Sequence, residues 1–141
     1  MSRAYFKLQE LDTKFDLLKS KQSILELGAA PGGWVRYIED KLSGHENLYI
    51  AVDPSPVKSS GLAKIISGKS SEPWVSQEIE RILELKKLDL VLSDMAPNIS
   101  GVKIVDDSAS RELAEEALNT AFRYLAPGGR MVAKLFQGPE A

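Results

Sequence analysis

The segment LELGAAPGGW, residues 25–34, constrains the fold most, because a short apolar run leads directly into three closely spaced glycines. Residues 23–27 are mostly apolar, which is typical of a buried parallel strand. Gly28, Gly32 and Gly33 lack a Cβ, so the backbone can turn sharply there and come close to a ligand. A helix after the turn would direct free N–H groups and its positive dipole end at that ligand. Glycine-rich turns are common, however, so this segment alone is weak evidence for a binding site.

An acidic residue after the next apolar run strengthens the prediction of a binding site. Asp53 directly follows the run LYIAV, residues 48–52. A carboxylate at the end of the second strand, roughly 20 residues after the glycines, accepts hydrogen bonds from ribose hydroxyls in nucleoside-binding sheets. The combination predicts a site for a nucleoside-containing cofactor.

Strand and helix patterns alternate along the chain, which predicts an α/β fold with a doubly wound, mostly parallel sheet. Strands are predicted at residues 23–27, 48–52, 63–66, 88–93 and 129–136, and helices at about 3–18, 33–42, 73–85 and 108–125. Residues 54–61 carry no clear pattern. The last helix is expected to end before the Pro127-Gly128-Gly129 turn and to direct five residues at the core, namely Leu113, Ala117, Leu118, Ala121 and Leu125.

The length of 141 residues suits one domain with a hydrophobic core and is too short for two. We therefore predict a single domain over residues 1–141, with a basic helix in residues 1–20 and the sheet-containing core in residues 21–141. No apolar run approaches the roughly 20 residues that a membrane-spanning helix needs, and no signal peptide opens the sequence. A cytoplasmic protein without a membrane partner is expected.

The composition excludes several kinds of site. Cysteine is absent, which excludes disulfides, thiolate metal sites and cysteine nucleophiles. The single histidine, His45, lies in a polar segment, so no metal site is predicted. The formal net charge of −2 is not typical of nucleic-acid binding, and any such function must depend on a local basic patch.

Three further polar residues lie where a sheet of this kind keeps its site. Asp94 directly follows the strand predicted at 88–93, and residues 95–101 behind it form a stiff turn rather than a helix start. Lys134 interrupts the apolar run MVAKLF, where burying a lysine is costly unless it is paired or functional. Lys7 belongs to a short basic helix. Each has a purely structural alternative. Asp94 could cap a loop, Lys134 could be an edge residue with its ammonium in solvent, and Lys7 could be a solvated helix residue.

Four segments together resemble the FtsJ/RrmJ-type RNA ribose 2′-O-methyltransferases, the large-subunit ribosomal RNA methyltransferase E group. They are SRAYFKL, LGAAPGGW, SDMAPNISG and LAPGGRMVAKLFQG. The glycine-rich segment is typical of methyltransferases in general, whereas the other three are much more specific. The resemblance extends from Ser2 to Gly138 and implies a Rossmann-like, class I methyltransferase fold.

The resemblance implies S-adenosyl-L-methionine as the cofactor, bound across the strand ends. Gly32 and Trp34 would line its methionine and ribose side, Asp53 would accept from the ribose hydroxyls, and Asp94 would lie near the methionine moiety. The complete set of implied cofactor residues is Gly28, Ala30, Pro31, Gly32, Gly33, Trp34, Asp53 and Asp94.

The resemblance also implies an in-line transfer of a methyl group from the sulfonium to a ribose 2′-oxygen. The family uses a Lys-Asp-Lys-Glu set, and three of its members match Lys7, Asp94 and Lys134. We expect Lys134 to act as the general base and Asp94 to orient it. A free lysine has a pKa of about 10.4, but burial, a nearby Lys7 ammonium and the sulfonium would each lower it. Substrate steering is the alternative role for Lys134.

Two departures from the family pattern stand out. The glutamate of the catalytic set comes from a later strand, so the C-terminal strands are expected to be missing after Ala141, and a shortened chain is the simplest interpretation. The family usually carries an aspartate near the adenine, where this chain has Lys69. Lysine cannot accept a hydrogen bond, so backbone groups or Ser70 are expected to contact the adenine.

The implied partner is RNA, either large-subunit ribosomal RNA or the large ribosomal subunit, bound by a monomer. Arg3 and Lys7 are the predicted RNA-binding residues, whereas Lys14, Lys19 and Lys21 can equally form a solvated helix face. Alternatives are the same chemistry on transfer RNA or an mRNA cap, and a catalytically weakened RNA- or ribosome-binding module. A nicotinamide-dependent oxidoreductase is disfavoured because the turn reads GAAPGG instead of GxGxxG.

Overall fold

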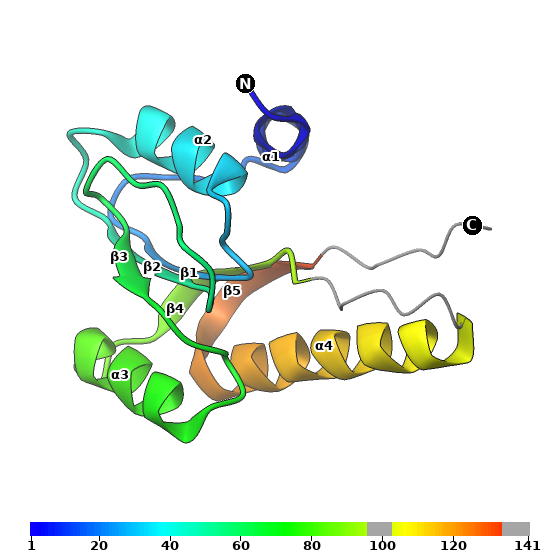
Figure 1. Cartoon of the computed structure of the whole chain (residues 1–141). Coiled ribbons are helices and arrows are strands. Elements are labelled where there is room, and N and C mark those ends of the chain that lie inside the picture. Colours follow the sequence, from blue (N-terminus) through cyan, green and yellow to red (C-terminus); the bar gives the residue numbers. More distant parts are fainter. Residues whose placement is uncertain (96–102, 134–141) are drawn as a thin grey trace.

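The computed structural model of the chain describes residues 1–95 and 103–133, with only the backbone course for residues 103–110. A parallel sheet lies between two pairs of helices, with α1 and α2 on one face and α3 and α4 on the other (Figure 1). The elements in chain order are α1 (Arg3–Phe15), β1 (Ser23–Leu27), α2 (Gly33–Leu42), β2 (Leu48–Val52), β3 (Lys64–Ile66), α3 (Pro73–Leu83), β4 (Leu88–Ser93), α4 (Lys103–Tyr124) and β5 (Leu125–Ala133).

The sheet has the strand order β3-β2-β1-β4-β5, and every described strand pair is parallel. The chain first adds strands on one side of β1 and then crosses to the other side, so the strand order reverses between β1 and β4. Sheets of this topology bind ligands beside that switch point, at the carboxyl ends of the strands. The predicted α/β fold class is confirmed.

The apolar side chains of the strands alternate between the two faces of the sheet and form two cores. Ile24 of β1 and Leu92 of β4 belong to the core under α1 and α2, whereas Leu25 and Val91 belong to the core under α3 and α4. Because both faces are covered, the strands are near-continuous apolar runs. This pattern explains why β1, β2 and β4 begin and end where the sequence predicts them.

Three element boundaries differ from the prediction by one to three residues. α1 ends at Phe15 rather than residue 18, because Asp16 adopts a left-handed conformation (φ 51°) and its N–H donates to the Asp12 carbonyl. α3 likewise ends at Leu83, two residues early, before a left-handed Glu84. β3 begins at Lys64 instead of residue 63, because the Ala63 N–H donates to the Glu39 carboxylate at 2.9 Å.

The last helix ends before the Pro127-Gly128-Gly129 segment as predicted, but the predicted starts of this helix and of the last strand were wrong. α4 begins at Lys103, five residues earlier than predicted, and ends at Tyr124, so the Pro127-Gly128-Gly129 segment lies inside β5. Leu125 pairs with Leu88 of β4, and a register irregularity between Leu88 and Leu90 accommodates that segment. Residues 134–136 of the predicted strand lie outside the described residues.

Only two of the five core positions predicted for the last helix are buried helix positions. Leu125 belongs to β5, Leu113 is half-buried, and Leu118 is exposed. Leu118 is 47% exposed, whereas Ala117 and Ala121 are buried against the sheet. Small residues at i and i+4 bring the helix close to the strands, and a residue one position further along is rotated by about 100° from that stripe. The side chain of Leu118 therefore lies off the buried face.

One ionisable side chain is buried inside the sheet. Glu26 on β1 is 1% exposed, and the Tyr49 hydroxyl donates a hydrogen bond to its carboxyl group. Burial raises the pKa of Glu26 to about 8. The hydrogen bond from Tyr49 opposes this rise, and the Asp94 and Asp53 carboxylates add to it. Glu26 is therefore mostly protonated at neutral pH.

We expect Glu26→Gln to remove a pH-dependent loss of stability. In the unfolded chain the carboxyl ionises near pH 4.5, but in the folded chain only near pH 8. Its contribution to stability is therefore complete below pH 4.5 and is lost as the pH rises to about 8. Between pH 4.5 and 8.5, the free energy of unfolding of the wild type should fall relative to the variant by at most roughly 5 kcal/mol.

Urea unfolding at both pH values measures this difference. Glu46→Gln, at an exposed loop glutamate, should leave the pH dependence as in the wild type. A Glu26→Gln variant that loses stability in parallel with the wild type would contradict the raised pKa.

Candidate functional site

The five strands end in one row, which places three site residues side by side. Leu27 of β1 pairs with Val52 of β2 and with Ser93 of β4. Gly28, Asp53 and Asp94 come directly after these three residues in the sequence. The ladder continues one step further, since the Gly28 N–H donates to the Val52 carbonyl at 3.0 Å and the Asp94 N–H to the Leu27 carbonyl at 2.9 Å. Backbone hydrogen bonds therefore hold the start of the glycine-rich turn beside Asp94.

Gly28 can only be glycine in this arrangement. Its φ is +75°, a conformation that side chains with a Cβ rarely adopt. A Cβ built there would lie 2.7 Å from the Met95 nitrogen and 2.9 Å from the Asp94 carbonyl carbon. The absence of a side chain lets β1 and β4 stay adjacent beyond their last paired residues.

The Asp53 carboxylate anchors the glycine-rich turn to the end of β2. Its Oδ2 accepts from the Ala30 N–H at 3.0 Å, and its Oδ1 accepts from the Ser55 N–H at 2.8 Å. Each carboxylate oxygen can accept a second hydrogen bond. Asp53 can therefore hold the turn and also accept hydrogen bonds from ligand hydroxyls.

A cavity of about 1290 Å³ opens over these strand ends, and we name it the strand-end pocket. Its volume exceeds the roughly 300–1,000 Å³ that is typical of small-molecule sites, so the pocket is large enough for a nucleoside-containing cofactor. Four of the predicted cofactor residues line the pocket: Gly28, Ala30, Asp53 and Asp94.

The other predicted cofactor residues lie outside the lining of this pocket. The Pro31 carbonyl accepts from the Lys58 N–H at 3.0 Å, and Gly32 caps the start of α2. Gly33 is the first residue of α2, and Trp34 is buried behind it and lines a different groove. A role of these four residues in binding the cofactor remains a prediction.

The pocket extends from the strand ends to residues that follow β3. Ser70 lines it, as expected for an adenine contact, and its hydroxyl donates to the Met95 sulfur at 3.5 Å. The Lys69 N–H donates to the Glu72 carboxylate at 2.9 Å. The far wall contains Asn119 and Thr120 of α4, which the sequence did not single out because only tertiary packing brings that helix over the strand ends.

A second groove, which we name the α1 groove, lies between α1 and the end of β5. Asp94 lines both the α1 groove and the strand-end pocket. Lys7 lines the α1 groove with its side chain 65% exposed, and its ammonium lies 3.7 Å from the Glu10 carboxylate. The structure thus brings two members of the predicted catalytic set to one groove. Lys134 lies outside the described residues, but Ala133, the preceding residue, lines the groove.

The predicted RNA-binding residues both lie at the α1 groove. Arg3 lines it together with Lys7, and Lys14 also contributes. Lys19 and Lys21 are exposed and do not line the groove, and Lys19 forms an ion pair with Asp16 at 3.6 Å. The structure therefore separates the basic residues of the N-terminal region into a groove set and a solvated set.

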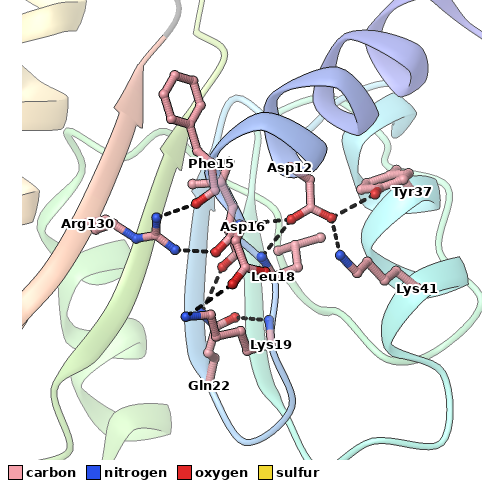
Figure 2. Close-up of polar contacts among 10 residues, drawn as sticks. Asp12, Phe15, Asp16, Leu18, Lys19, Gln22, Tyr37, Lys41 and Arg130 are labelled. Atoms are coloured by element: carbon pink, nitrogen blue, oxygen red, sulfur yellow. Dashed lines mark hydrogen bonds and ion pairs between the residues drawn. The ribbon is translucent and has the colours of Figure 1, made fainter.

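A buried aspartate fixes α1 against α2 (Figure 2). The Asp12 carboxylate, on a residue only 2% exposed, accepts from the N–H groups of Leu17 and Leu18 at 2.9 Å and from the Tyr37 hydroxyl at 2.7 Å. Lys41 of α2 adds a charged hydrogen bond. Burial by itself would raise the pKa of Asp12, but the hydrogen bonds from Lys41, Leu18 and Tyr37 outweigh it and hold the pKa below its usual value.

The two ends of α1 are held by separate contacts. At the C-terminal end, the Arg130 guanidinium of β5 donates to the carbonyls of Phe15 at 2.7 Å and Asp16 at 2.5 Å (Figure 2). At the N-terminal end, a Cβ on Gly33 would lie 2.6 Å from the Ser2 hydroxyl, so α1 and α2 approach as closely as glycine permits. The helix that carries Arg3 and Lys7 is therefore fixed relative to the sheet.

Sequence reasoning missed Asp12 and Arg130. A signal for Asp12 was present, because it follows Tyr5 and Leu8 at helical spacing on the buried side of α1. A charge on an apolar helix face points to a buried partner. Arg130 offered no such signal, since its partners are backbone carbonyls more than 110 residues away.

Within residues 1–95 and 103–133, no group of three or more His, Cys, Asp or Glu side chains is placed to hold a metal ion. Among the helices of those residues, none is both long enough and apolar enough to cross a membrane.

The chain resembles one group of known proteins over its whole length. The sequence profile of FtsJ-like methyltransferases matches residues 1–141. A ribosomal RNA large subunit methyltransferase E from Coxiella burnetii is 44% identical over 142 residues, which covers 98% of this chain and 66% of that protein. A protein of the same name from Legionella pneumophila is 41% identical over 137 residues, with 97% and 66% covered. The chain therefore spans 66% of the length of each relative.

A solved structure gives the same result in three dimensions. The crystal structure described as a ribosomal RNA methyltransferase from Plasmodium falciparum superposes with a TM-score of 0.88 at 31% identity. The match covers 99% of this chain and 80% of that protein.

We expect Asp12→Ala to lower the free energy of unfolding by roughly 2–4 kcal/mol, because it leaves the Lys41 ammonium and two backbone N–H groups without their buried acceptor. Glu10→Ala, on the exposed side of the same helix, removes only an exposed ion pair and should cost less than about 1 kcal/mol. Chemical denaturation of both variants measures the difference. Equal losses would show that Asp12 does not hold α1 in place.

Proposed function

Because the chain belongs to the FtsJ-like methyltransferase family, we propose that it binds S-adenosyl-L-methionine and methylates a ribose 2′-hydroxyl of large-subunit ribosomal RNA. One observation carries the proposal: Asp94 lines both the strand-end pocket and the α1 groove. Methyl transfer needs a donor site and an acceptor site that meet at one point. The names of the Coxiella and Legionella relatives support large-subunit ribosomal RNA as the acceptor.

The strand-end pocket is the proposed cofactor site. Asp53 retains acceptor capacity for the ribose hydroxyls, and we expect Ser70, which lines the pocket, to contact the adenine. Gly28 allows the backbone to pass close to the methionine end beside Asp94. When bound there, S-adenosyl-L-methionine supplies an electrophilic methyl group on its sulfonium. The pocket offers carboxylate, hydroxyl and backbone groups that can form hydrogen bonds, and this combination suits a nucleoside with a charged amino-acid end.

The α1 groove is the proposed RNA site. Arg3 and Lys7 would contact phosphates at its rim, and the 2′-hydroxyl of the bound strand would approach Asp94 at its inner end. We propose Lys134 as the group that accepts the hydroxyl proton, with Asp94 orienting its side chain and Lys7 completing the set. In support, Ala133 lies on the groove and pairs with Ser93, the residue before Asp94.

We propose that residues 1–141 form a single methyltransferase domain that acts as a monomer in the cytoplasm on ribosomal RNA or the large ribosomal subunit. In support, the described residues form one sheet with two cores, and α1 packs directly on that sheet and its helices.

Calorimetric titration tests the cofactor site. The chain should bind S-adenosyl-L-methionine and not NAD, and Asp53→Ala should weaken binding by roughly tenfold or more, because hydrogen bonds to a charged acceptor are lost. Glu46→Gln, an exposed carboxylate outside the pocket, should bind as the wild type does. Binding of NAD, or wild-type affinity in a folded Asp53→Ala variant, would contradict the proposed cofactor site.

Methyl transfer from labelled S-adenosyl-L-methionine to large-subunit ribosomal RNA tests the acceptor site. Lys7→Ala should lower kcat by roughly 100-fold or more, as is typical when a group that takes part in proton transfer or positioning is lost, while cofactor affinity stays unchanged. Lys19→Ala, an exposed lysine outside the groove, should remain active. Equal activity of the two variants would exclude Lys7 from the catalytic set.

A further inference from the structure

An exposed aromatic ring lies in the α1 groove without a role in the proposed reaction. Phe6 is 52% exposed, lines the groove, and stands between Arg3 and Lys7 on α1. Single exposed apolar residues are common at protein surfaces and need no functional explanation. The surroundings of Phe6, however, distinguish it from such a residue.

The Phe6 ring is supported by two buried aromatic rings. It contacts the Tyr5 ring edge-to-face, with centroids 5.5 Å apart and planes at 76°, and Tyr5 contacts Tyr37 in the same way at 5.3 Å and 89°. The Tyr5 hydroxyl donates to Asp40 at 2.9 Å, and the Tyr37 hydroxyl donates to Asp12 at 2.7 Å. Carboxylates of two elements thus anchor the row of rings, and a ring that is already held in place loses less entropy when a ligand stacks on it.

The charges around Phe6 suit a nucleic-acid strand. Three cations, Arg3, Lys7 and Lys14, line the same groove against two carboxylates, Glu10, which pairs with Lys7, and Asp94. Cations that can meet phosphates, beside an aromatic face that can stack on a base, are the two components of single-stranded nucleic-acid sites. The groove also leads to Asp94, where the target ribose must arrive.

We propose that Phe6 is a stacking platform for a nucleobase in the single-stranded RNA segment that carries the target ribose. This inference rests on the proposed function and adds to it a recognition requirement: the base must be unpaired and accessible on one face. Stacking by an aromatic side chain is tolerant of base identity. Phe6 would therefore select for an exposed, unstacked nucleotide rather than for a sequence.

The chain offers a matched control for Phe6. Phe15 is on the same helix and is 50% exposed, yet it does not line the groove. The Lys14 ammonium lies 5.4 Å from the centre of the Phe15 ring, so Phe15 also has a cation beside it. Loss of Phe15 removes a similar exposed aromatic surface without touching the proposed RNA site.

The test uses single-stranded RNA oligonucleotides of about 12 nucleotides, each with one 2-aminopurine, whose fluorescence falls when the base stacks. The wild type should quench one probe position, and Phe6→Ala should abolish that quenching and raise the Kd, measured by anisotropy, by roughly 5- to 150-fold. Phe6→Trp should retain both signals, and Phe15→Ala should behave as the wild type. With an abasic site at the quenched position, Phe6→Ala and the wild type should bind equally.

Three outcomes would overturn the inference. If Phe6→Ala and Phe15→Ala bind every probe as the wild type does, Phe6 is not a platform, although the proposed RNA site stands. If the loss in Phe6→Ala persists with the abasic strand, the ring acts through the groove structure and not through a base. A wild type that binds S-adenosyl-L-methionine but no RNA probe would instead refute the RNA part of the proposed function, and the inference with it.

Discussion

The parallel register of β1 between β2 and β4 is the constraint on which the rest of the site depends. The last residue of each strand pairs with its neighbours in a single row across the sheet, which reads Ile66, Val52, Leu27, Ser93 and Ala133. The residues that follow the first four of them, Ser67, Asp53, Gly28 and Asp94, therefore leave the sheet on the same side, which carries the glycine-rich turn and both aspartates. A shift of one strand by one residue would move a carboxylate away from the turn and reverse the faces of that strand.

The α1 groove depends on a second and different kind of interaction. α1 is joined to the rest of the chain through buried polar contacts of Asp12 and through backbone carbonyls held by Arg130 (Figure 2). These directional contacts fix the angle and height of the helix more narrowly than apolar packing alone. The strand-end pocket and the α1 groove are thus built by separate means and meet at Asp94, so a change in one can leave the other intact.

The predictions succeeded where local pattern and tertiary environment agree. β1, α2, β2 and β4 have the predicted bounds because both faces of the sheet are covered and glycine or polar residues end each run. They failed at the start of β5, which was predicted at residue 129 because the Pro127-Gly128-Gly129 segment is a strong local signal for a turn. Pairing of Leu125 with Leu88 of β4 extends the strand backwards through that turn segment, and no local pattern reports such a long-range hydrogen bond.

The sequence by itself determined the α/β class and the position of Asp53 and Asp94 at the strand ends, because each aspartate directly follows an apolar run in the chain. Lys7 was singled out only through the family resemblance, and the roles of all three residues stay predictions. Only the tertiary structure decided that Asp94 is shared between a pocket and a groove, and that Tyr5, which contacts the Phe6 ring, is itself held against Tyr37. These features depend on the packing of α1 against α2 and β5. Packing distances between elements remote in sequence are set by side-chain shape and buried hydrogen bonds, which local patterns do not encode.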